Sequence, residues 1–344
     1  MTTKWLMIET FGDAAPSIVG LGSAPRRFVP IERVLKSRDS LELVKRIIEE
    51  VSASPGQIDR RSADGQRRLI VEPLITFSGR LHGIHLWFGR SNETVPEHDP
   101  AGAWLFNLTA GKASGSVALL DLYGVPEDER HTEKAMAGAF TRLRTNHDES
   151  DALSKIVQSQ PGTVHQAVWT VERDDGELRA AHFSCRMLKE NDPETGQPQV
   201  ILRGITQDIG PAVEVTSAPP PVVLEYRVLE AATNDGEYRA IVNLKTLQLI
   251  RWVGDAMPGL AWESVDDQVE PSIHPDDFHI ALAMSEGLAR GKTHGVIRFR
   301  QLSGAWKTYA VEATLMMLDQ HTTAGLVMIR EASSPESERP MHLT

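Results

Sequence analysis

Hydrophobic and polar residues follow one pattern that recurs three times along the chain. In each copy, a stretch with apolar residues at helical spacing precedes runs of strand-like alternation. The first helical stretch begins at Asp39, the second near Asp148 and the third at His274. Their apolar faces comprise Leu41, Val44, Ile47, Ile48 and Val51 in the first, Leu153, Ile156 and Val157 in the second, and Phe278, Ala281, Leu282 and Leu288 in the third. The pattern therefore predicts three helices of similar position in three similar units.

A polar residue followed by glycine marks the same place in each unit. These glycines are Gly65, Gly176 and Gly304, which are separated by 111 and 128 residues. Glycine adopts positive φ without steric cost, and a preceding Asp or Ser bonds the local backbone. Each site is therefore predicted to be the tight turn of a β-hairpin.

Strand-like runs surround each turn. Copies two and three open with hairpins, 104–111 followed by 116–120 and 240–246 followed by 249–253, and the final strands are 81–88, 200–209 and 324–329. Consecutive hairpins with helices segregated to one face predict an α+β fold with antiparallel sheets. The expected domains are residues 1–92, 101–210 and 222–333, with a proline-rich linker at 211–221 and a disordered tail at 334–344. A polar, proline-containing connection spans 91–100.

The order of these motifs resembles tandem PAS domains with appended PAC segments. In the middle unit the resemblance rests on the segment Trp104–Gly111, on Leu122-Tyr123-Gly124, on the Asp175-Gly176 turn and on the closing run Arg203–Ile209. In the third it rests on Ile273–Asp277. The first unit resembles the family in its second half only, as a shortened PAS-like or GAF-like domain. The resemblance implies three five-stranded antiparallel sheets, each with helices on one face and a cavity between them.

Aromatic residues on the predicted strands of the middle unit are the candidate ligand contacts. The residues expected around this cavity are Trp104, Phe106, Trp169, Phe183 and Met187. Most aromatic residues on strands belong to cores, so a ligand cavity is the less common alternative. We expect the middle unit, which is the most complete, to hold the ligand.

The histidines and the single cysteine predict no metal site. His82 and His85 are three residues apart on a strand, which places them on opposite faces. His274 is expected to cap a helix, and His279 or His147 would be the nearest axial ligands for a haem. Cys185 lies in a strand-like run, outside the helix motif that flavin-binding PAS domains use. Haem or flavin is therefore left open as a cofactor, although no motif indicates either one.

Charge and composition indicate which classes of binding partner are not expected. The chain has 344 residues, 36 Lys and Arg against 47 Asp and Glu, and a net charge of −11. An acidic chain without clustered basic residues is not expected to bind nucleic acid directly. The chain contains no apolar run of the roughly 18 residues that span a membrane. With one cysteine and no signal-peptide pattern, the expected location is the cytoplasm.

These observations predict a signal-sensing adaptor rather than an enzyme. The three units fill the chain up to residue 333, and catalytic sequence motifs are lacking. We expect a small-molecule ligand, a regulatory protein partner and a homodimer. Met136, Ala139, Phe140 and Leu143 recur at helical spacing and suit either a core or that dimer interface. The alternative function is a structural dimerisation scaffold with filled cores.

Overall fold

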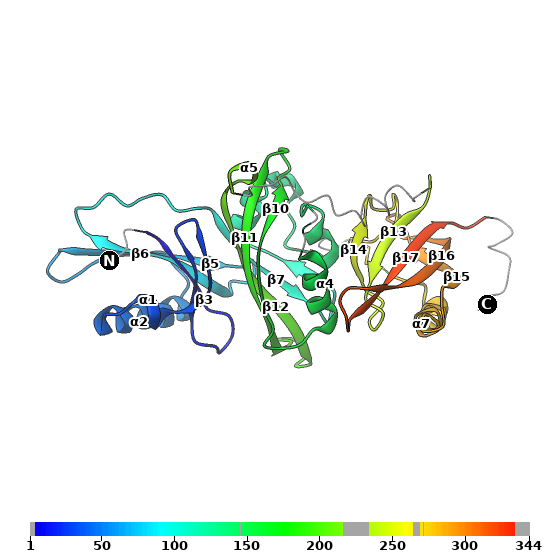
Figure 1. The fold of residues 1–344 in the computed structure, drawn as a ribbon, viewed down its shortest axis with the longest axis horizontal. Helices are drawn as coiled ribbons and strands as arrows, with labels where there is room; N and C mark the ends of the chain where they lie inside the picture. Colours follow the sequence, from blue (N-terminus) through cyan, green and yellow to red (C-terminus); the bar gives the residue numbers. More distant parts are fainter. Residues whose placement is uncertain are drawn as a thin grey trace. The chain divides into compact units, whose positions relative to one another are not determined.

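Three antiparallel sheets organise the protein (Figure 1). The computed structural model describes residues 4–144, 146, 148–215, 234–263, 269–270 and 272–333. The described sheets have six, six and five strands. Three sheet-containing domains are therefore confirmed, but five strands in each is wrong for the first two. The strands that the sequence analysis missed, β3 (Ala24–Pro30) and β9 (Glu133–Ala135), lie at sheet edges.

The first domain packs its helices on one face of its sheet. Its elements are β1 (Leu6–Glu9), β2 (Ser17–Leu21), β3, α1 (Ile31–Val34), α2 (Arg38–Ala53), β4 (Ile58–Arg61), β5 (Arg67–Ile75) and β6 (Leu81–Arg90). The strand order is β3-β2-β1-β6-β5-β4. Helix α2 buries Val44, Ile47, Ile48 and Val51 against Ile8, Val71 and Ile84 of the sheet. The predicted apolar face of this helix is confirmed, with Leu41 only partly buried.

The other face of the first sheet contributes to a second core. Met7, Phe11, Val19 and Leu74 of the first domain pack with Ala101, Ala103 and Ile205 of the middle domain. Glycine at position 83 permits this approach, because a Cβ there would lie 2.7 Å from the Ile205 Cδ1 atom. Buried Glu9 accepts hydrogen bonds from the Ser17 hydroxyl at 2.6 Å and the Phe11 amide at 2.8 Å. Apolar burial on this second face therefore joins the first and middle domains.

A bulge in β6 changes where His82 points. Leu74 pairs with Gly83 and Ile75 pairs with Leu81, so His82 is an extra residue in its strand. The His82 ring contacts Phe11, and its Nδ1 lies 3.1 Å from the Gly204 carbonyl oxygen of the middle domain. His85 pairs with Met7, whose side chain lies on the same face. The prediction that the two histidines occupy opposite faces is therefore wrong, because strand alternation fails at a bulge.

The middle domain has the longest strands. Its elements are β7 (Ala101–Asn107), β8 (Lys112–Ser114), α3 (Val117–Leu122), η1 (Glu127–Glu129), β9, η2 (Met136–Phe140), α4 (Glu149–Gln158), β10 (Val164–Glu172), β11 (Leu178–Asn191), β12 (Pro198–Pro211) and α5 (Ala212–Val215). The sheet order is β10-β11-β12-β7-β8-β9. Helix α4 buries Leu153, Ile156 and Val157, as predicted.

One local expectation for the middle domain is wrong, and one alternative that the sequence left open is decided. Residues 116–120 begin helix α3 rather than a strand, because the Ser116 side chain accepts a hydrogen bond from the Leu119 amide and caps the helix. Residues 136–140 form the 3-10 helix η2, in which Met136 and Phe140 are buried within the chain. These two side chains are therefore unavailable for the expected dimer interface.

The third domain has the expected five strands. Its elements are β13 (Tyr238–Val242), β14 (Leu249–Val253), η3 (Pro275–Asp277), α7 (Phe278–Gly287), β15 (Thr293–Arg300), β16 (Trp306–Met317) and β17 (Thr323–Glu331). The order is β14-β13-β17-β16-β15, with α7 beside the sheet (Figure 1). Helix α7 buries Ile280, Ala281 and Met284, whereas Phe278 and Leu282 are exposed. Of the expected apolar face, Ala281 and Leu288 are buried as predicted, whereas Phe278 and Leu282 were misassigned to it.

The start of this helical region is capped by His274, as the sequence predicts. The His274 side chain accepts a hydrogen bond from the Asp276 amide and so caps η3. Asp277 forms a two-pronged pair with the Arg298 guanidinium, at 2.6 and 2.9 Å. This hydrogen-bonded pairing lowers the pKa of the Asp277 carboxyl. The buried Asp277 carboxylate therefore has a structural partner in Arg298.

The described chain divides into two compact units. The first contains Met1–Phe106, Ser114–Thr132 and Pro161–Pro219, and the second contains Asn107–Ala113, Glu133–Gln160 and Pro220–Thr344. Three hairpin turns recur in them as predicted, with φ of 69° at Gly65, 85° at Gly176 and 82° at Gly304. Most of the expected linker, residues 216–221, and the expected tail at 334–344 lie outside the described residues.

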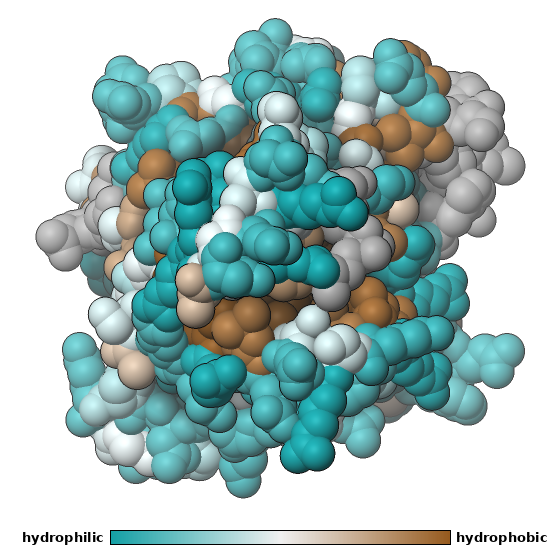
Figure 2. All heavy atoms as spheres, turned by 90° about the vertical axis from the view of Figure 1, so that its left-hand side faces the viewer, coloured by the Kyte–Doolittle hydropathy of each residue, from teal (hydrophilic) through white to brown (hydrophobic). Residues whose placement is uncertain are grey.

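Figure 2 shows an apolar area surrounded by hydrophilic residues on the face that is turned to the viewer. Within the described ranges, no helix has the length and apolar character needed to cross a membrane.

Candidate functional site

The predicted ligand residues of the middle domain gather on one face of its sheet. Trp104 of β7 donates its indole N–H to the Thr206 hydroxyl at 2.9 Å. Glycine at position 204 leaves room for the indole, because a Cβ there would lie 2.1 Å from the Trp104 ring. Phe106 lies beside it, with the two ring centroids 4.7 Å apart. This end of the predicted site is thus closely packed.

The other predicted residues share that face. Trp169 meets Phe183 edge to face, with ring centroids 4.9 Å apart. Trp169 and Met187 are each only 2% exposed. These contacts are typical of a packed core. The ligand role of the five middle-domain residues therefore stays a prediction.

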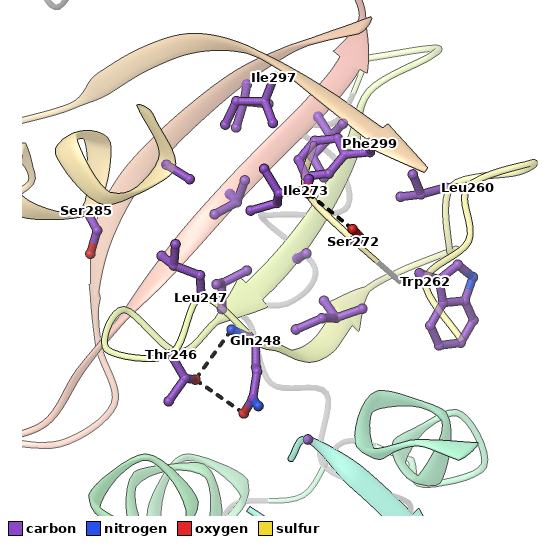
Figure 3. Close-up of a pocket in the computed structure, with 18 of the residues that line it drawn as sticks. Thr246, Leu247, Gln248, Leu260, Trp262, Ser272, Ile273, Ser285, Ile297 and Phe299 are labelled. Carbon is purple, nitrogen blue, oxygen red and sulfur yellow. Dashed lines mark hydrogen bonds between the residues drawn. The ribbon is translucent and has the colours of Figure 1, made fainter. Parts of the chain in front are cut away.

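A cavity of about 540 Å³ lies in the second compact unit, mainly within the third domain (Figure 3). Its volume is within the range that small-molecule sites occupy. The lining comprises Ala110, Gly111, Lys112, Ala135, Ala240, Val242, Leu244, Thr246, Leu247, Gln248, Leu249, Trp252, Leu260, Ala261, Trp262, Glu270, Ser272, Ile273, Phe278, Ala281, Met284, Ser285, Leu288, Ile297, Phe299, Val311, Ala313, Val327 and Ile329. Most of these side chains are aliphatic or aromatic.

Strand alternation and small residues create this space. Alternate residues of the sheet face it, among them Val311 and Ala313 of β16. Ala240 on β13 and Ala281 on α7 add two short side chains, so the helix and the sheet leave room between them. In Figure 3, Ser285 and Trp262 lie on opposite sides of the cavity, with Ile273 between them. The alanines at these core-facing positions were the sequence signal that could have identified the cavity.

Four residues that precede the third domain in the sequence complete the lining of the cavity. Ala110, Gly111, Lys112 and Ala135 belong to the middle domain in sequence, but to the second compact unit in space. Gly111 has a φ of 73°, and a Cβ there would lie 3.0 Å from the side-chain carbonyl carbon of Gln248. The Gln248 amide donates a hydrogen bond to the Thr109 carbonyl oxygen at 2.9 Å. The site is therefore built from both sequence domains.

An ion-paired cluster forms the charged part of the lining. Lys112 Nζ lies 2.7 Å from Glu133 Oε1 and 3.4 Å from Glu270 Oε1. The hydrogen bond to Glu133 raises the pKa of Lys112, since it favours the charged amine. Lys112 and Glu270 are the charged residues among the described lining. The cavity is thus apolar inside, with paired charges at one part of its wall.

The cofactor candidates are not brought together. Among the residues that the structure describes, no three His, Cys, Asp or Glu side chains form a metal-binding group. His279 is exposed, and His147 lies outside the described residues. Cys185 is buried in β11, as its strand-like setting predicts. Neither His279 nor Cys185 is among the described residues that line the cavity, and haem or flavin stays open as a cofactor.

Comparisons with known proteins identify the relatives of the chain. Sequence models of the Rv3651-like family match at residues 4–97 for the N-terminal domain, 100–208 for the middle domain and 223–339 for the C-terminal domain. No curated protein matches the chain.

Solved structures include one match over the whole length. The crystal structure of an uncharacterised protein from Mycobacterium tuberculosis is 26% identical, with a TM-score of 0.83, and the match covers 97% of this chain and 98% of that one. A sensory box histidine kinase/response regulator from Burkholderia thailandensis matches 39% of this chain and 85% of its own, at 16% identity. Its TM-score of 0.24 is too low to support an argument about fold.

The family assignment corrects the one made from the sequence. The predicted PAS family is not the one that matches, although the tandem arrangement of three domains is confirmed. The PAS-like motifs are turns, caps and strand ends, which many α+β folds require for the same physical reasons. Because its three models match in order and together span the described domains, the chain belongs to the Rv3651-like family.

Proposed function

We propose that this protein is a cytoplasmic signal-sensing adaptor that binds a small molecule and regulates a partner protein. The cavity of the second compact unit carries the proposal, because its 540 Å³ volume and apolar lining suit a small organic ligand. The binding site is assigned to this cavity rather than to the middle-domain aromatic cluster, whose rings are packed together. The proposal assigns no chemical reaction to the chain.

The composition of the lining supports a sensing role. A ligand in the cavity would touch the third-domain sheet and also Gly111 and Ala135 from the middle domain in sequence. In the same compact unit, the Gln158 amide of α4 donates to the Thr322 hydroxyl at 2.6 Å, and Arg251 of β14 pairs with Glu149. Ligand occupancy can therefore alter contacts between segments that are distant in sequence, and a partner can detect that change.

A cavity-filling variant tests the proposal. Ala313→Phe places a ring in the cavity, whereas Ala310→Phe adds the same ring to the opposite face of the same strand. Native mass spectrometry of the purified full chain, with titration of the neutral fluorophore N-phenyl-1-naphthylamine, measures occupancy. We expect the wild type and Ala310→Phe to bind, and Ala313→Phe to lose at least about tenfold in affinity.

The alternative function, a dimerisation scaffold with filled cores, predicts a different result. In that case neither native mass spectrometry nor the fluorophore detects binding in the wild type. Ala313→Phe would then change only the free energy of unfolding, by about 1–3 kcal/mol if the ring is overpacked. Circular dichroism of both variants shows that each is folded before binding is compared.

A further inference from the structure

We propose that the cavity selects an uncharged, hydrocarbon-rich molecule and rejects an anion of the same shape. This inference rests on the proposed function, because it names the ligand class of the same cavity. It goes beyond that function by excluding fatty-acid-like and phosphate-bearing ligands.

The charges of the lining are already neutralised by one another. Lys112, the cation of the described lining, lies within 3.4 Å of two carboxylates, those of Glu133 and Glu270. The three groups together carry one net negative charge. An anionic headgroup would therefore have to displace a carboxylate from Lys112 or remain uncompensated in an apolar site. The cluster is partly exposed, with 34% of the Lys112 side chain and 63% of the Glu270 side chain accessible, so an anion would meet net negative charge at this wall and would lack a partner deeper in the apolar site.

The hydroxyl groups of the lining have also committed their donors. Ser285 donates its hydroxyl to the Leu244 carbonyl oxygen at 2.9 Å, and Ser272 donates to the Ile273 carbonyl oxygen at 3.1 Å. The Thr246 hydroxyl donates to Gln248 Oε1 at 3.2 Å (Figure 3). With these donors used inside the protein, a polar ligand would give up hydrogen bonds with water and recover few. A ligand that is mostly hydrocarbon has no such cost.

One buried donor suits a single neutral oxygen on the ligand. Trp252 is 7% exposed and contributes to the lining, and within the described residues its indole nitrogen has no hydrogen-bond acceptor. Buried polar groups without a partner are uncommon, and an absent ligand atom is one explanation. A hydroxyl, ether or carbonyl oxygen would serve as the acceptor.

A matched pair of ligands tests this selectivity. Dodecanol and dodecanoate have the same chain and differ in the charge of the headgroup at pH 7.5. Each competes with N-phenyl-1-naphthylamine for the full-length protein, below its micelle concentration. We expect dodecanol to bind at least about tenfold more tightly than dodecanoate. Equal or tighter binding of dodecanoate would overturn this inference and leave the proposed function standing. Displacement by neither ligand, with no fluorophore binding, would overturn both.

Variants of the ion-paired cluster test whether the cluster causes the preference for an uncharged ligand. Glu133→Gln combined with Glu270→Gln leaves Lys112 available to an anion, so the preference for dodecanol should fall by about tenfold. Glu312→Gln is the control, because Glu312 pairs at 2.8 Å with Lys292, which is not part of the lining. An unchanged preference in the double variant would contradict the role assigned to the cluster.

Discussion

At the residue scale, two histidines in the first domain are deeply buried. His82 and His85 are buried, at 0% and 2% exposure. Burial disfavours the charged imidazolium and lowers the pKa of each to about 3, with the ordinary value near 6.5. His85 packs between aromatic neighbours, with its ring centroid 4.3 Å from that of His98 and 6.2 Å from that of Trp5. The neutral rings act here as core side chains.

These histidines predict acid sensitivity. Between about pH 6.5 and 3 the unfolded chain binds protons that the folded chain does not, so stability falls as the pH is lowered through this window. Each histidine contributes up to about 1.4 kcal/mol per pH unit. Urea unfolding between pH 7.5 and 5 measures the slope, which His85→Phe should reduce. His279→Gln, at an exposed position, should leave it unchanged, and an unaltered slope in His85→Phe would contradict the assignment.

The middle-domain tryptophan cluster predicts a stability effect. Trp169→Ala removes a ring that is 2% exposed and packed edge to face against Phe183, so we expect a loss of about 3–5 kcal/mol in the free energy of unfolding. Val164→Ala on the same strand is the comparison, since Val164 is 41% exposed and should cost less than about 0.5 kcal/mol. A small loss for Trp169→Ala, together with lost ligand binding, would instead support the site expected from the sequence.

At the element scale, the connection between the first and middle domains differs from the flexible linker that its composition suggests. The Trp5 indole donates to the Pro96 carbonyl oxygen at 2.7 Å, and His98 Nε2 lies 2.8 Å from Glu72 Oε2. Asp99 accepts from the Gln207 amide at 2.9 Å and from the Ser23 hydroxyl at 3.1 Å. Residues 91–100 are therefore held by side chains from both domains.

These anchors change the expected result of limited proteolysis. Composition alone predicts early cleavage within 91–100, whereas the structure predicts slow cleavage, because proteases need locally unfolded backbone. Trp5→Phe with Asp99→Ala removes three of the hydrogen bonds and should accelerate cleavage there several-fold. Peptide mapping by mass spectrometry measures the rates. If the wild type is cut at 91–100 as fast as the variant, the anchors have no effect on local stability.

At the scale of the whole molecule, the tandem arrangement of domains does not by itself determine whether two copies of the chain associate. We propose a homodimer, for which η2 cannot supply the interface because Met136 and Phe140 are buried in their own chain. Exposed apolar side chains at the end of β16, Leu315 at 46% and Met317 at 58%, are the alternative surface. Exposed apolar residues often mark a surface where two copies of a protein meet.

Light scattering over a range of concentrations tests the dimer. We expect a mass near twice the 38.0 kDa of the chain, and the double variant Leu315→Lys with Met317→Lys should return it to that of one chain. The control is Val213→Lys, at an 84% exposed apolar position of the middle domain, which should leave the mass unchanged. A mass near that of one chain at every concentration would exclude the dimer.

The sequence by itself determined the features that depend on neighbours along the chain. The turn glycines at 65, 176 and 304, the apolar stripe of α2 and the capping histidine at 274 all follow from local backbone and side-chain preferences. These preferences act over a few residues, so they can be read without knowing the fold. The order of these local features along the chain predicted three repeated α+β domains.

Only the tertiary structure decided where a cavity forms and which residues distant in sequence touch. The cavity depends on alanines at 240, 281 and 313, which lie on three separate elements and meet only when the sheet and helix pack. The bulge at His82 and the burial of Met136 likewise depend on partners distant in sequence. A strand shows which side chains alternate, but it does not show whether the facing element fills the space between them. For that reason the sequence favoured the aromatic middle domain, whose ligand role stays a prediction, and did not single out the cavity in the second compact unit.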